Sequence, residues 1–152
     1  MGKKYLRIIF FLIIVFFING IGAIFPPDNW YFELNKPPWT PPPWIFGPVW
    51  TCLYVTIALA GEKCWQLRQS RKELFNLWCA QLVSNAVWSP LFFGLKSPVI
   101  AVIDILVLDL LVFYLIVKLY RTSNKYAYLL VPYFSWISFA TILNAVICWL
   151  NF

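Results

Sequence analysis

The sequence has 152 residues, of which 62% are hydrophobic and 12% are charged, and its formal net charge is +6. A soluble domain of this size needs more polar surface, so the composition is typical of a membrane protein. The chain has no histidine, and its four cysteines include no C-x-x-C pair. The sequence therefore excludes the usual zinc sites and histidine-dependent nucleophiles, and we expect no metal site and no obligatory cofactor.

Five apolar segments are long enough to cross a bilayer, whose hydrocarbon core takes about 20 helical residues. They cover residues 5–25, 44–67, 73–94, 98–120 and 125–151. The first begins with basic residues like a signal peptide, but its length and the lack of a small-residue cleavage site favour a retained helix. Short connections make neighbouring helices antiparallel. We therefore predict an all-α integral membrane protein, a five-transmembrane-helix bundle that forms a single domain over residues 1–152.

The basic residues are distributed unevenly between the two sides of this bundle. Ten of the twelve fall near the N-terminus, the second connection and the fourth, and only Lys36 and Lys96 fall on the other side. The ten are Lys3, Lys4, Arg7, Lys63, Arg68, Arg71, Lys72, Lys118, Arg121 and Lys125. Because basic loops stay in the cytoplasm, we expect a multi-pass protein with a cytoplasmic N-terminus, in a bacterial inner membrane. The positive charge is then a topology signal, and no nucleic-acid partner is expected.

Three segments each carry a stripe of aromatic, small and amide or hydroxyl residues at helical spacing. The stripes are Gly47, Trp50, Tyr54, Ala58 and Gly61; Gln81, Ser84, Asn85, Trp88 and Phe92; and Tyr133, Trp136, Ala140 and Asn144. Two interpretations remain open: the stripes are helix-packing contacts, or they line a pocket for a flat, largely apolar ligand. Trp50, Trp88 and Trp136 favour the pocket, because each lies several residues inside its segment.

Two carboxylates, Asp104 and Asp109, lie within the fourth segment. Five residues apart on a helix, they point about 140° from one another and cannot face the same neighbour. A carboxyl at that depth is expensive unless it is paired or protonated. We expect Asp104 to accept hydrogen bonds from a neighbouring helix, or one of the two to be buried in a self-association face. A proton relay is the weaker alternative, because the segments hold no histidine partner.

Four stretches of the chain resemble the translocator protein family, whose members are also called tryptophan-rich sensory proteins or peripheral-type benzodiazepine receptors. They are KPPWTPPPWIFGPVW at residues 36–50, SNAVWSPLFFGLKSP at 84–98, AVIDI at 101–105 and VPYFSWISFATILNAVICWLN at 131–151. The four stretches occur in the family's order among five predicted spans, so the resemblance covers essentially the whole chain.

The resemblance implies a five-helix fold, often dimeric, with a cavity below the first loop. That cavity binds porphyrins such as protoporphyrin IX and synthetic isoquinoline carboxamide or benzodiazepine ligands. Carried across residue by residue, its ligand-binding positions are Tyr31, Pro41, Trp50, Tyr54, Asn85, Trp88, Phe92, Trp136, Ala140 and Leu143. The mammalian relatives end with a cholesterol-recognition sequence that the terminal WLNF lacks, so cholesterol is not an expected partner. Without histidine, a metal-free porphyrin held by ring stacking is the expected ligand.

The first hypothesis for function is a receptor or sensor of tetrapyrroles, linked to tetrapyrrole homeostasis or a stress response. The alternatives are a tetrapyrrole transporter, or a catalyst of the light-dependent porphyrin breakdown known among relatives, with Trp50 and Trp136 as electron or radical partners. Residues 37–43 are expected to form a stiff, extended crossing that serves as a lid over the pocket, because proline fixes its own φ and donates no backbone hydrogen bond. Trp39 is predicted to hold this lid against the helix ends, and Trp50 to point into the cavity.

Overall fold

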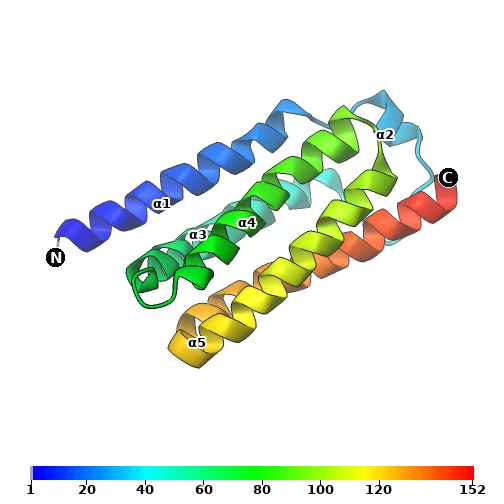
Figure 1. Ribbon diagram of the computed structural model, residues 1–152. Helices are drawn as coiled ribbons and strands as arrows, with labels where there is room; N and C mark the ends of the chain where they lie inside the picture. The colour runs from blue at the N-terminus through cyan, green and yellow to red at the C-terminus, as the bar shows by residue number, and fades with distance from the viewer. Residues whose placement is uncertain (1) are drawn as a thin grey trace.

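The computed structural model describes residues 2–152, except for the side chains of Ala23 and Asn124; Met1, which the expected domain includes, lies outside the described residues. Over this range every regular element is a helix. The elements are α1 (Gly2–Gly20), η1 (Ile21–Ile24), α2 (Asn29–Glu33), α3 (Pro43–Leu67), α4 (Lys72–Ser89), η2 (Pro90–Gly94) and α5 (Pro98–Asn151). The long helices form an elongated bundle, with α2 and the C-terminus at the end opposite the N-terminus (Figure 1). The all-α prediction is confirmed.

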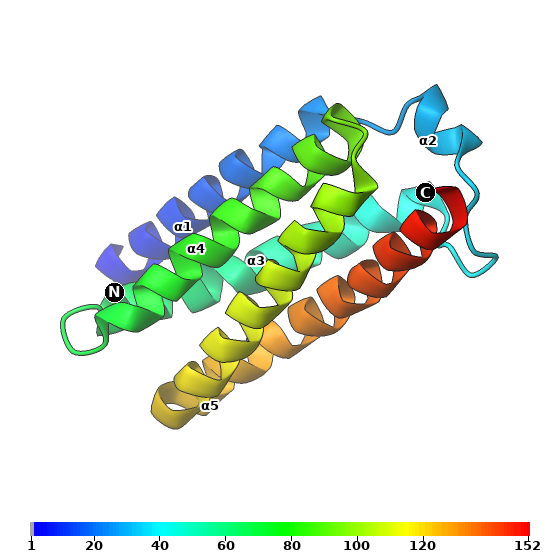
Figure 2. The ribbon, with the colours of Figure 1, turned by 45° about the vertical axis from the view of Figure 1, so that its right-hand side comes forward.

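Helix α5 is a hairpin of two helices. Ser123 has φ −161° and ψ 79°, outside the helical region. The chain reverses there, so that the yellow first half and the orange-to-red second half run side by side (Figure 2). The reversal falls in the polar stretch RTSNK at residues 121–125. Such a stretch offers no apolar face to pack on a neighbouring helix, so tertiary contacts do not hold it straight.

Three helical segments of the described chain are long and apolar enough to cross a membrane. They are Pro43–Leu67, Pro98–Ser123 and Lys125–Asn151. Helices α1 and α4 have 19 and 18 residues, or about 28 and 27 Å, close to the roughly 30 Å of a hydrocarbon core. Helix α1 contains three cations, Lys3, Lys4 and Arg7, and amides and hydroxyls make α4 less apolar. The structure therefore supports three membrane-crossing segments directly, and that α1 and α4 also cross the membrane is part of our proposal.

The segment predicted at residues 73–94 changes helix type at Pro90. Helix α4 ends at Ser89, and η2 is a π-helix in which the Leu95 N–H donates to the Pro90 carbonyl at 2.8 Å. Proline has no N–H for the usual i→i−4 bond, so the turn widens. The segment predicted at 5–25 also changes type, because the α-helix ends at Gly20 and η1 is a 3₁₀ helix.

Helices α3 and α4 pack closely at Gly61. A Cβ at this position would overlap the ring of Trp78, so only glycine fits. The Trp78 indole N–H donates to the Ile57 carbonyl at 2.9 Å. Phe11 of α1 packs edge-on against the same indole, with 5.2 Å between ring centroids. Gly61, the last residue of the α3 stripe, is therefore a helix-packing contact, which is the first of the two interpretations.

The first loop contains a short helix, α2, that sequence reasoning did not predict. Asp28 caps its N-terminus by accepting a hydrogen bond from the Tyr31 N–H at 3.4 Å. At its other end, the Lys36 ammonium donates to the carbonyls of Tyr31, Phe32 and Leu34 at 2.7 to 3.2 Å. These two side chains satisfy backbone groups that a five-residue helix leaves unpaired at both ends.

The proline-rich part of the loop is not the fully extended crossing that we expected. The Thr40 N–H donates to the Pro37 carbonyl at 3.0 Å and closes a turn over residues 37–40. Pro38 occupies the second position of this turn, where its fixed φ is favourable. Trp39 lies at the tip, with its ring centroid 5.8 Å from that of Phe139 on α5. Trp39 thus contacts α5, but twelve residues before the end of that helix and not at the helix ends as predicted.

Two further contacts attach the loop to the helices. Asn35 and Asn151 exchange two hydrogen bonds, both at 2.8 Å, between the loop backbone and a side chain near the end of α5. The Lys96 ammonium lies 2.7 Å from the Asp28 carboxylate and joins the loop to the turn between η2 and α5. This hydrogen bond from Lys96 holds the pKa of Asp28 below its usual value.

The N-terminus, the α3–α4 turn and the bend of α5 lie at one end of the bundle (Figure 1). The ten basic residues that were predicted to share a side belong to these regions, whereas Lys36 and Lys96 belong to the loop end. We call the two ends the basic end and the loop end.

Candidate functional site

Aromatic side chains of α3 and of the second half of α5 meet near the proline-rich loop. The ring centroid of Trp136 lies 5.7 Å from those of Phe46 and Phe139. The centroid of Trp50 lies 5.5 Å from that of Tyr54 and 6.3 Å from that of Tyr133. We call this group the aromatic site; its members are Phe46, Trp50, Tyr54, Tyr133, Trp136, Phe139 and Ala140. All except Tyr133 are only partly buried, so their surfaces are available to a ligand.

A chain of hydrogen bonds joins the aromatic site to α4. Asn85 donates its amide N–H to the Tyr133 hydroxyl at 2.9 Å, and that hydroxyl donates to the side-chain carbonyl of Gln81 at 2.9 Å. Tyr133 is fully buried. Because Gln81 and Asn85 are four residues apart, they lie on the same face of α4. The chain of bonds satisfies the buried hydroxyl and fixes α4 against α5.

The indole Nε1 of Trp136 is buried and has no hydrogen-bond partner among the described residues. The corresponding atom of Trp88 donates to Asn144 at 3.2 Å. An unsatisfied buried donor costs about 1 to 3 kcal/mol. A ligand that brought an acceptor to Trp136 would remove this cost, so Nε1 is a specific point of attachment in an otherwise apolar site.

A second cluster lies around Phe92, closer to α2. Trp88 stacks on Phe92 with 5.0 Å between ring centroids, and Tyr31 lies 6.2 Å from Phe92. Leu143 packs into the same cluster. Burial raises the pKa of the Tyr31 hydroxyl, which therefore stays protonated at physiological pH. These side chains therefore pack closely against one another.

The structure places nine of the ten predicted ligand-binding residues in two groups that meet at Trp88. Trp50, Tyr54, Asn85, Trp136 and Ala140 lie in or beside the aromatic site; Tyr31, Phe92 and Leu143 belong to the Phe92 cluster; and Pro41 lies partly exposed in the loop. Trp88 packs against both groups. The expected single pocket thus corresponds to an accessible part and a closely packed part.

Four side chains of this region were not among the predicted ligand-binding residues. Tyr133 and Gln81 belong to the sequence stripes, and their spacing alone placed them on the correct faces. Phe46 and Phe139 contact Trp136 directly. Phe46 is four residues before Trp50, and Phe139 is three residues after Trp136, so helical spacing could have identified both.

The two intramembrane carboxylates face different helices, as their spacing predicted. Asp109 accepts hydrogen bonds from the hydroxyls of Ser138 at 3.0 Å and Thr141 at 2.6 Å, inside the α5 hairpin. Asp104 faces α4 and accepts one hydrogen bond, from Ser84 at 3.0 Å, through Oδ1. Its Oδ2 is buried and has no partner among the described residues.

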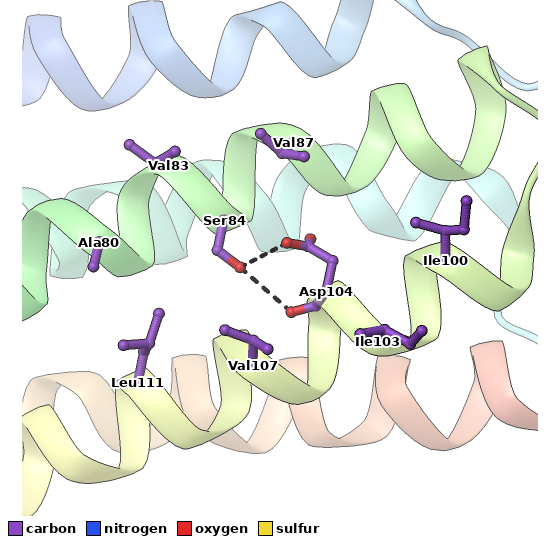
Figure 3. Close-up of a pocket in the computed structure, with 9 residues that line it drawn as sticks. All are labelled: Ala80, Val83, Ser84, Val87, Ile100, Ile103, Asp104, Val107 and Leu111. Carbon is purple, nitrogen blue, oxygen red and sulfur yellow. Dashed lines mark hydrogen bonds between the residues drawn. The ribbon is translucent and has the colours of Figure 1, made fainter.

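Asp104 lies at a groove of about 610 Å³ between α4 and the first half of α5 (Figure 3). The lining residues are Ala80, Val83, Ser84, Val87, Ile100, Ile103, Asp104, Val107 and Leu111. The groove is open along its length, and none of the ten predicted ligand-binding residues lines it. It is therefore a surface distinct from the aromatic site.

An α-helical bundle with segments long and apolar enough to cross a membrane defines the class: an integral membrane protein. Sequence comparison identifies the family. The model of the TspO/MBR family matches residues 9–150, and the chain belongs to this family. The resemblance that the four sequence stretches indicated is thereby confirmed.

The curated relatives cover most of the chain. It is 38% identical over 152 residues to the tryptophan-rich protein TspO of Archaeoglobus fulgidus, which spans 96% of this chain and 97% of that protein. It is 39% identical over 123 residues to the tryptophan-rich sensory protein of Cereibacter sphaeroides, across 81% and 77% of the two chains. It is 33% identical over 132 residues to the human translocator protein, across 84% and 75%. Family membership supports a sensor or receptor role in a membrane.

Proposed function

We propose that this protein is a membrane receptor or sensor that binds porphyrins such as protoporphyrin IX, and also isoquinoline carboxamide or benzodiazepine-type ligands, within its helix bundle. In this proposal α1 and α4 cross the bilayer with the three more apolar segments, and the protein acts as a homodimer in tetrapyrrole homeostasis or a stress response. The names of two relatives, tryptophan-rich sensory protein and translocator protein, support this assignment.

The observation that carries the proposal is the unpaired N–H of Trp136 within a partly buried aromatic site. A porphyrin has two flat faces that stack on indole and phenol rings. It also carries propionate groups, and an isoquinoline carboxamide carries a carbonyl oxygen. Either group supplies the acceptor that Trp136 Nε1 lacks. Stacking and this one hydrogen bond explain how a chain without histidine holds a metal-free tetrapyrrole.

The loop supports the proposal as a cover for the site. Three contacts attach it to the helices: the Asn35–Asn151 pair, the Asp28–Lys96 ion pair and the contact of Trp39 with Phe139. Phe139 is itself a neighbour of Trp136. A ligand that displaces Phe139 would therefore move Trp39 as well, which links occupancy of the site to the conformation of the loop.

Titration of the purified protein with protoporphyrin IX, followed by quenching of tryptophan fluorescence, tests the proposal. We expect saturable binding and about tenfold weaker affinity in Trp136→Phe, which keeps a ring but removes the N–H, a loss of about 1.4 kcal/mol. Ala140→Thr is expected to weaken binding by adding bulk to the site. Trp149→Phe on the same helix is the control, because Trp149 is 87% exposed. Unchanged affinity in both site variants would exclude this location.

The orientation and the two alternative functions have their own tests. We propose a cytoplasmic basic end in a bacterial inner membrane. A membrane-impermeant thiol reagent applied to intact cells should label a cysteine placed at the loop end and not one placed at the basic end; the opposite result would reverse the orientation.

A transporter would make porphyrin uptake into sealed vesicles depend on the protein. A catalyst of light-dependent breakdown would bleach bound porphyrin faster than detergent alone, and loss of this rate in Trp50→Phe and Trp136→Phe would identify its radical partners.

A further inference from the structure

A groove of about 480 Å³ lies between α1 and α4, and no residue of the aromatic site lines it. Helix α1 contributes positions from Arg7 through Ile14 to Ile18, which share one helix face at spacings of three and four. Phe75 and Cys79 of α4 form the opposite wall, and the buried ring of Trp78 lies at the base. The groove is apolar along its whole length, apart from Arg7 at one end.

The length of the groove corresponds to one leaflet of a bilayer. Arg7 and Ile18 are eleven positions apart on α1, which is about 16 Å at 1.5 Å per residue. Half of a hydrocarbon core is about 15 Å. The groove therefore begins at the basic end of the bundle and extends inward as far as a single acyl chain does.

The open end of the groove is strongly basic. Arg7 makes one side-chain hydrogen bond among the described residues, from Nε to Glu62 at 3.0 Å, and its side chain is 41% exposed. Its terminal amines remain available as donors. Lys3 and Lys4 lie one turn earlier on the same face of α1 and are exposed. The basic end holds ten basic residues and two acidic ones, Glu62 and Glu73, so its field attracts anions.

We propose that this groove is a binding site for an anionic phospholipid. One acyl chain lies along α1 and α4 over Trp78, and Arg7, Lys3 and Lys4 hold the phosphate. Basic pockets between helices at a membrane face are typical sites for anionic headgroups. The site is separate from the aromatic site and does not depend on the proposed porphyrin binding.

Native mass spectrometry of the full-length protein in detergent tests the site with two probes, phosphatidylglycerol and phosphatidylcholine of identical acyl chains. We expect the first phosphatidylglycerol to bind at least fivefold more tightly than the first phosphatidylcholine. Removing these cations should lower the preference toward equal affinity for the two lipids. Arg7→Gln is one such variant. Lys3→Gln/Lys4→Gln is the second. It keeps the ion pair between Arg7 and Glu62, so a loss of lipid preference in this variant does not come from an unpaired Glu62.

Two further variants separate the groove from general surface charge. Arg121→Gln removes a cation from the same end of the bundle, at the bend of α5, and should leave the preference unchanged. Cys79→Phe places a ring in the groove and should weaken the first binding event for both lipids. Equal affinity for the two lipids would overturn the proposal. A preference that survives Lys3→Gln/Lys4→Gln, that falls equally in Arg121→Gln, or that is untouched by Cys79→Phe would also overturn it.

Discussion

Two ion pairs lie at opposite ends of the bundle, and the shorter one is expected to contribute less to stability. At the loop end, Lys96 lies 2.7 Å from Asp28, and both side chains are about half exposed, at 47% and 48%. At the basic end, Arg7 lies 3.0 Å from Glu62, whose side chain is only 2% exposed. Water solvates either member of the exposed pair when the other is lost, but it does not reach Glu62. Burial, rather than distance, therefore sets the importance of each pair.

The two pairs also connect different parts of the molecule. Glu62 accepts further hydrogen bonds from Gln66, at 2.7 and 2.8 Å, and its pairing with Arg7 holds α1 against α3. The pair at the loop end attaches an irregular segment to a turn. Lys96 in that turn has a φ of 51°, which carries a small backbone cost for a residue other than glycine. The ion pair at the basic end thus joins two helices through a buried carboxylate, whereas the pair at the loop end joins two irregular segments at the surface.

Arg7→Leu is expected to have the largest effect. It leaves the Glu62 carboxylate buried without its cation, which should lower the free energy of unfolding by about 3 kcal/mol. Unfolding in detergent micelles, followed by circular dichroism, measures the change. The double variant Arg7→Leu/Glu62→Leu should recover most of the loss, because it removes the buried charge as well. A single variant as stable as the unmodified protein would show that water reaches Glu62.

Gly61→Ala is expected to have the next largest effect, about 2 kcal/mol in the same measurement. The added methyl group overlaps the ring of Trp78, which must then move away from the Ile57 carbonyl. Gly47→Ala on the same helix is the matched control, because no atom lies within 4 Å of a Cβ there. If the two substitutions had equal effects, close packing would not distinguish the basic end from the loop end.

Asp28→Asn is expected to have the smallest effect, confined to the loop. Lys96 holds the pKa of Asp28 below its usual range. A lowered pKa in the folded state stabilises above the ordinary carboxyl range, and this contribution is lost as the pH falls below about 4. Hydrogen exchange of the α2 amides should therefore be faster in the variant at pH 7, and the difference should diminish as the pH falls below about 4. A global loss of stability at pH 7 would contradict the comparison.

Much of the fold was predictable, because a bilayer restricts the possible structures. Apolar segments of suitable length must be helices, and short polar connections must be turns. The reversal at RTSNK follows from this reasoning. The π-helix at η2, the α2 helix and the turn over residues 37–40 were not predicted, because they depend on individual hydrogen bonds around Pro90, Asp28 and Pro38.

The candidate site was predictable to a lesser degree. Helical spacing identified which residues share a face, and it placed Asp104 and Asp109 on different neighbours. It did not show which positions of the stripes would form helix-packing contacts and which would form the aromatic site. Gly61 and Ser84 are packing and hydrogen-bonding positions, whereas Trp50 and Trp136 remain partly accessible on stripes of the same type.

The sequence alone determined that this protein is a helical membrane protein, which residues share a helix face and which end of the bundle is basic. These properties follow from hydropathy, helical period and charge. Only the tertiary structure decided which polar atoms find partners. Asn85, Tyr133 and Gln81 satisfy one another across two helices, whereas Trp136 Nε1 has no partner among the described residues. A hydrogen bond requires two atoms to lie within a few tenths of an ångström of about 2.9 Å, and helical spacing does not specify the distance between side chains far apart in the sequence.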